Sequence, residues 1–253
     1  MNRVIRILVG VLSSISLFFI YRFPNLLLLL IVLIVWLSGL VLIYLYMQRD
    51  SENKWEDLPS VITTSIALVA LLSLVEWPPL IYFLIFLGGV VVALLFRNGG
   101  ADSDMLPYLK KPIRRMIMML WVFDAYALQT TLFAIAIFFT DIPFWAIVLL
   151  GSLLFVYVSF MIWRLYFSVP IKSFFLWLLI VGLIVSELIW IVGLLPFGYA
   201  VSGFVVTWFW YILQLFVRFH FSKQGIVWKS QRWFVLTNAV LMVVFFIFIF
   251  RWI

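Results

Sequence analysis

Residues 26–47 read LLLLLIVLIVWLSGLVLIYLYM, a run of 22 residues without a single charged side chain. The hydrocarbon core of a bilayer is about 30 Å thick, and a helix needs about 20 mostly apolar residues to cross it. Water does not reach the backbone groups in that core, so each of them must be hydrogen-bonded within the helix. The run therefore predicts a transmembrane helix and indicates the class of the protein.

Similar apolar runs recur along the chain. Of its 253 residues, 67% are hydrophobic and only 11% are charged. A soluble domain carries about 25% charged residues, so this chain lacks the polar side chains that a water-exposed surface requires. We predict an all-α, polytopic transmembrane bundle of about nine helices, in which residues 1–253 form a single transmembrane domain. The predicted spans are 4–21, 26–47, 60–76, 80–96, 116–139, 144–163, 174–194, 199–217 and 233–250.

The connections suggest four helical hairpins followed by a ninth helix. Each short turn contains proline. Because proline ends helices wherever a tight turn forms, the shared turns do not require gene duplication of a hairpin. The first run follows a basic N-terminus, but no small-x-small cleavage pattern comes after it, so we expect an uncleaved helix and not a signal peptide. The turn prolines are Pro24, Pro78, Pro79, Pro143 and Pro196, and the longer polar loops are 48–59, 97–115, 164–173 and 218–232.

Lysine and arginine predict the orientation. With the N-terminus inside, 15 of the 17 basic residues lie in inner segments, and only Arg22 and Arg251 lie outside. Because basic loops stay on the cytoplasmic side, we expect an N-in, C-out protein of the cytoplasmic membrane. The basic residues of these loops account for the net charge of +7. We therefore expect the lipid bilayer to be a partner of the protein, and we expect no nucleic-acid partner.

Two carboxylates lie deep within predicted spans. Asp124 lies about 12 Å and Glu187 about 20 Å from the inner boundary at 1.5 Å per residue. Each ionisable group inside a bilayer is costly and is a functional hypothesis by default. No basic residue lies at their depth, so each is either protonated or hydrogen-bonded. Polar residues at similar depths are Tyr126, Gln129, Thr130, Thr131, Ser186, Thr207 and Asn238.

We take Asp124, Glu187, Gln129 and Thr131 as a candidate site with two interpretations. One is the proton or ion site of a carrier, because an acid that can change protonation suits that role. The other is a polar clasp between helices, worth about 1 kcal/mol. Thr131 follows Asp124 by seven residues, which places both near one helical face.

Other chemistry is poorly supported. Cysteine is absent and His220 is the sole histidine, so thiolate sites and His-rich metal sites are excluded. We find no catalytic motif and expect no cofactor and no metal. Gly88 and Gly89 lie inside a predicted span, where small residues permit close packing of helices.

A basic cluster, Lys110, Lys111, Arg114 and Arg115, precedes the fifth span. Such clusters bind anionic lipid headgroups, with about 1 kcal/mol per charge near the surface. The cluster is equally explained as a contact for an acidic partner or as the topology anchor of the helix.

Three functional classes remain. The first is a non-enzymatic subunit or scaffold of a membrane complex, which the short loops and the lack of a catalytic motif favour. The second is a small proton- or cation-coupled transporter or channel that uses Asp124 and Glu187. Carriers usually have helices broken at mid-membrane, whereas proline here is confined to turns and loops. The third is an enzyme at the inner face that uses Asp102, Asp104 and the basic cluster.

Overall fold

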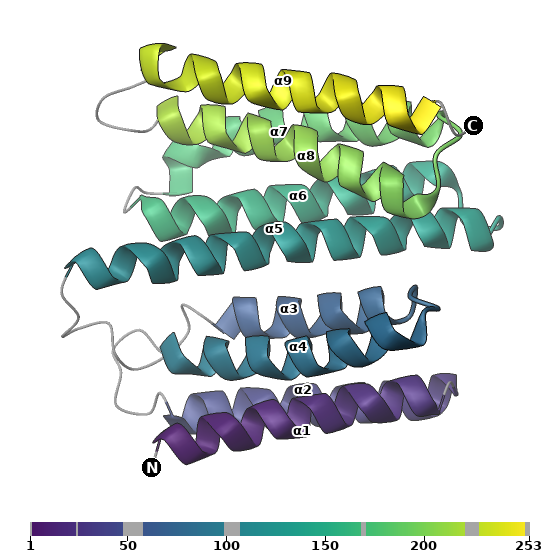
Figure 1. Cartoon of the computed structure of the whole chain (residues 1–253), viewed down its shortest axis with the longest axis vertical. Helices are drawn as coiled ribbons and strands as arrows, with labels where there is room; N and C mark the ends of the chain where they lie inside the picture. Colours follow the sequence, from purple (N-terminus) through teal and green to yellow (C-terminus); the bar gives the residue numbers. More distant parts are fainter. Residues whose placement is uncertain are drawn as a thin grey trace. The chain divides into compact units, whose positions relative to one another are not determined.

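The computed structural model describes residues 2–23, 25–47, 58–98, 107–167, 171–220 and 228–250. These residues form nine helices and no strand, so the prediction of an all-helical, nine-helix chain is confirmed (Figure 1). The helices are α1 (Asn2–Arg22), α2 (Leu26–Met47), α3 (Leu58–Leu72), α4 (Pro78–Asn98), α5 (Pro107–Phe138), α6 (Phe144–Tyr166), α7 (Ile171–Gly193), α8 (Tyr199–His220) and α9 (Trp228–Phe250).

Seven of the described helices are long and apolar enough to cross a membrane. The other two have shorter described apolar stretches, Leu58–Leu72 in α3 and Arg232–Phe248 in α9. At 1.5 Å per residue, α3 is about 22 Å long, which is shorter than the hydrocarbon core. The protein is therefore a multi-pass membrane protein.

Helix α5 differs most from its prediction. It begins at Pro107, nine residues before the predicted span starts at Met116, so the second half of the predicted loop 97–115 is helical. Proline is well tolerated at the first helical position because its missing N–H would have no partner there. The apolar run marks the part of a helix that lipid can surround, and a helix can extend beyond that part.

By their contacts, the residues form two compact units, Met1–Trp210 and Tyr211–Ile253, and the boundary falls within α8. In the first unit α1 packs against α2 and α4, while α3 packs against α4 and α5. Helix α6 packs against both α5 and α7. The second unit contains the last part of α8 and all of α9.

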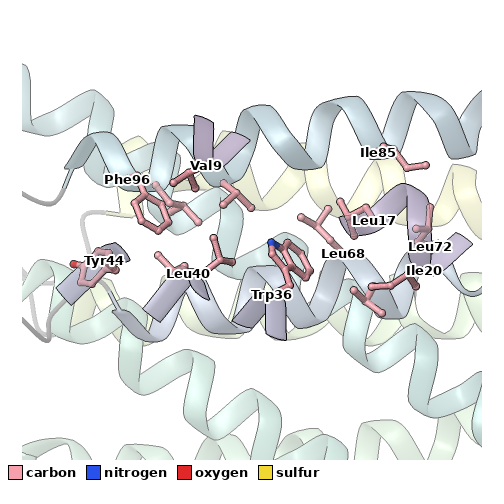
Figure 2. Close-up of a cluster of buried hydrophobic side chains, with 14 of the residues drawn as sticks. Val9, Leu17, Ile20, Trp36, Leu40, Tyr44, Leu68, Leu72, Ile85 and Phe96 are labelled. Carbon is pink, nitrogen blue, oxygen red and sulfur yellow. The ribbon is translucent and has the colours of Figure 1, made fainter. Parts of the chain in front are cut away.

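A hydrophobic cluster joins α1, α2, α3 and α4, and Figure 2 shows most of its buried side chains. It includes Leu17, Leu68 and Trp36, and the indole N–H of Trp36 donates a hydrogen bond of 3.1 Å to the hydroxyl of Ser13. Apolar side chains thus fill the space among these helices, and the polar atom of the tryptophan has a partner.

The glycine pair in α4 permits the close approach that the sequence predicts. A Cβ atom added to Gly89 would lie 2.6 Å from the carbonyl oxygen of Gly10 in α1 and would also contact the hydroxyl of Ser14. One added to Gly88 would lie 2.8 Å from a methyl group of Leu17. Ser14 strengthens the contact by donating to the carbonyl of Ile85 at 3.2 Å.

Candidate functional site

Asp124 lies in the interior of the first unit, on the side of α5 that faces α3. Its side chain is 0% exposed. The hydroxyl of Thr64 in α3 donates a hydrogen bond of 2.7 Å to its Oδ2 atom. Its Oδ1 atom is also buried and has no hydrogen-bond partner among the described residues. Half of the carboxyl group is therefore satisfied by a neighbouring helix, and half is not.

A second polar contact lies beside the first. Thr63, the neighbour of Thr64, approaches the hydroxyl of Tyr157 in α6 at 3.4 Å. The Tyr157 ring packs edge to face against Trp121, with 5.6 Å between ring centroids. Trp121 precedes Asp124 by three residues, so both lie on one side of α5. Helices α3, α5 and α6 thus meet around Asp124, Thr63, Thr64 and Tyr157.

Gln129 occupies a different side of α5. Five residues rotate a helix by about 140°, so Gln129 points away from Asp124. A Cβ atom added to Gly151 in α6 would lie 2.5 Å from Oε1 of Gln129 and 2.7 Å from Cδ1 of Ile189 in α7. The amide is 0% exposed, and neither its oxygen nor its nitrogen has a hydrogen-bond partner in the described part of the chain.

Thr130 faces the third neighbour, the first part of α8. A Cβ atom added to Gly203 would lie 2.9 Å from its Cα atom and would also contact its hydroxyl. The hydroxyls of Thr130 and of Thr207, one turn further along α8, are buried without a hydrogen-bond partner among the described residues. Asp124, Gln129 and Thr130 of α5 therefore face different neighbouring helices, and they do not form one site.

Glu187 lies on the opposite side of α7 from the residues that pack inward. Val181, Val185 and Ile189 are buried, and each follows the last by one turn. Glu187 is exposed. The structure therefore does not bring Glu187 beside Asp124, although the sequence analysis placed both in one candidate site. The exposed hydrophobic residues that share its side include Leu176, Leu179, Leu183, Trp190, Ile191 and Leu194.

Several expected partners bond within their own helix. Thr131 donates to the carbonyl of Ala127 at 2.8 Å, Ser186 to that of Leu183 at 2.7 Å, and the Asn238 amide to that of Phe234 at 2.8 Å. Sequence reasoning missed Thr64, the residue that contacts Asp124. The signal that could have indicated it is the run of hydroxyl residues in α3, which are Ser60, Thr63, Thr64 and Ser65.

The predicted basic cluster lies in the first turns of α5. Arg115 is exposed, while the side chains of Lys110, Lys111 and Arg114 lie outside the described part of the structure, as do Asp102 and Asp104. A spacing of i, i+1, i+4 and i+5 places the four basic residues along one side of the helix, a pattern that suits a charged surface.

The buried polar side chains described above offer hydroxyl, carboxyl and amide groups. Across the described ranges, no group of three or more His, Cys, Asp or Glu side chains could hold a metal ion.

Comparison with known proteins gives no relative, because no protein-family model, no curated protein and no solved structure matches the chain.

Proposed function

We propose that the protein is a non-catalytic subunit or scaffold that packs α7 against a different membrane protein. The observation that carries this proposal is the exposed carboxyl group of Glu187 within an otherwise apolar helix side. Glu187 lies 13 residues after Phe174 and six before Gly193, the ends of the apolar span. These separations correspond to about 20 Å and about 9 Å along the helix.

Lipid tails cannot hydrogen-bond a carboxyl group, so a polar group on the lipid side of a helix is costly. Acidic residues in membrane helices almost always face a protein interior or pair with another polar group. A neighbouring transmembrane helix with a basic or hydrogen-bonding side chain at the same depth would provide that pair. The surrounding leucine residues and Trp190 would supply the packing surface, since dispersion contacts contribute to helix association in membranes.

Native mass spectrometry of the protein, extracted gently from its own membrane, tests the proposal. We expect a second protein at fixed stoichiometry with the natural sequence. Glu187→Leu should remove it, whereas Glu187→Gln should retain part of it because the amide still forms hydrogen bonds.

Asp124→Asn is the matched control, since it changes a carboxyl group that is buried inside the unit. It should leave the complex intact. A lone chain, a complex of identical chains only, or a partner that survives Glu187→Leu would contradict the proposal.

A second candidate function is a small proton- or cation-coupled carrier, and the unpartnered oxygen of Asp124 favours it. Because Glu187 faces away from the interior, such a carrier would use Asp124 without Glu187. Flux measurements on the reconstituted protein test this: Asp124→Asn should abolish cation-dependent flux, and Glu187→Gln should preserve it. Flux that survives Asp124→Asn would exclude this carrier mechanism.

A further inference from the structure

We infer that Asp124, Thr64, Thr63 and Tyr157 form a binding site for one small monovalent metal cation such as Na⁺. The inference deepens the second candidate function by naming its ligand, but binding itself requires no transport. A subunit without any flux can hold such a cation between its helices.

Asp124 has one unsatisfied, buried carboxyl oxygen. Buried polar atoms nearly always have a partner, and each exception needs an explanation. Thr64 satisfies Oδ2 at 2.7 Å, but Oδ1 has neither a hydrogen-bond partner among the described residues nor contact with solvent. A polar clasp between α3 and α5 explains the Thr64 contact and leaves Oδ1 unexplained, whereas a cation bound at Oδ1 explains both.

Thr63 and Tyr157 supply further oxygen ligands. Hydroxyl hydrogen bonds have a usual length of about 2.8 Å, and the contact between Thr63 and Tyr157 is longer, at 3.4 Å. Both hydroxyl oxygens therefore retain the capacity to bind another group. The contact between Trp121 and Tyr157 holds the phenol on the same side of α5 as Asp124, so the oxygens come from three adjoining helices.

The charge of the surrounding residues favours a monovalent cation. Residues 58–96 and 116–163, which include α3 and α6 up to Trp163, contain no lysine, arginine or histidine. A single carboxylate balances one positive charge, so a monovalent cation leaves the interior neutral. A divalent cation would need a second carboxylate, and the other acidic residues of these two ranges, Glu76 and Asp141, lie 12 residues after Thr64 and 17 residues after Asp124. Ligands that are all oxygen favour hard cations over transition metals.

Cation-dependent stability of the whole purified chain in lipid nanodiscs tests the inference. The thermal unfolding temperature is measured in NaCl, LiCl, KCl and choline chloride at equal ionic strength. A ligand that binds the folded state alone raises stability with its concentration. We expect the unfolding temperature to be higher in NaCl than in choline chloride, and to rise with the Na⁺ concentration until it saturates. Trp fluorescence should change over the same Na⁺ range with the same midpoint. This fluorescence change should disappear in Trp121→Phe.

The variants separate binding from folding. Asp124→Asn keeps an oxygen for Thr64 and should abolish the Na⁺ effect while the protein remains folded. Thr64→Val should weaken Na⁺ binding about tenfold, the lower end of the effect of losing a residue that orients a ligand. Glu187→Gln changes the other carboxyl group that lies deep in a predicted span, and it should leave the midpoint of the Na⁺ titration unchanged.

Equal unfolding temperatures in Na⁺ and choline would overturn the inference, as would a Na⁺ effect that persists in Asp124→Asn. A response to pH without any preference among cations would assign a proton to the site and would also overturn it. Loss of Na⁺ binding would leave intact the complex with a second membrane protein, which depends on Glu187. The cation site and the subunit function can therefore fail independently.

Discussion

Thr64 provides the hydrogen bond that satisfies part of Asp124 inside the protein. Thr64→Val keeps the shape of the side chain but removes the donor, which leaves both carboxyl oxygens without a protein partner. A buried group that loses its partner costs about 1–3 kcal/mol, so we expect the free energy of unfolding to fall by about that amount. Reversible unfolding in mixed micelles measures it.

Two controls frame this experiment. Thr64→Ser retains the donor and should lose less stability than Thr64→Val. Ser65→Ala changes the next buried hydroxyl, which bonds to the carbonyl of Val61 in its own helix at 2.8 Å, and it should have a smaller effect. Equal losses in Ser65→Ala and Thr64→Val would indicate that the contact with Asp124 contributes nothing specific.

At the same scale, the sequence indicated two acidic residues within apolar runs but not how the polar residues are grouped in space. Asp124 and Glu187 both stand out as acids in apolar runs. In a soluble helix, periodicity would separate the buried side from the exposed side, but in a membrane both sides are apolar. The outward position of Glu187 was therefore hidden in the sequence. The pairing of Asp124 with Thr64 depends on which helices are neighbours, and that information is not local.

At the scale of elements, the contact between α1 and α4 depends on Gly89. Gly89→Ala would place a methyl group 2.6 Å from the carbonyl oxygen of Gly10, and this backbone atom moves only with its helix. We expect a loss of about 1–3 kcal/mol, as for overpacked cores, measured by thermal or chemical unfolding.

Gly39→Ala in α2 is the matched control, because an added Cβ atom there has no neighbour within 4 Å. It should leave stability unchanged within about 1 kcal/mol. If both variants were equally stable, the two helices would not require a glycine at their contact.

The sequence predicted the presence of each helix, but it predicted the residues at which the helices begin and end less accurately. Apolar length revealed the nine helices of the described residues, since a single segment satisfies its backbone inside lipid only as a helix. It placed the start of α5 too late because four of the eight residues between Pro107 and Met116 are basic, and charge excludes them from lipid but not from a helix. The small residues at Gly88 and Gly89 correctly indicated close packing, although not the identity of α1 as the partner.

At the scale of the whole molecule, the orientation in the membrane remains a prediction from the basic loops. The chain has no cysteine, so single-cysteine variants can be labelled without any background. In intact cells, an impermeant maleimide should label Thr140→Cys, in the turn between α5 and α6. It should label Ser51→Cys, between α2 and α3, only after permeabilisation. The reverse pattern would contradict the N-in orientation.

The polar interior of α5 also affects how the protein is made. Among the seven described helices long and apolar enough to cross a membrane, α5 is the least apolar. During synthesis α3 emerges before it, whereas α6 and α8 emerge after it. Asp124 can therefore meet Thr64 at once, while Gln129 and Thr130 still face lipid or the translocon. We therefore expect a nascent chain that ends after α5 to hold this helix in the bilayer less stably than a chain that continues through α8.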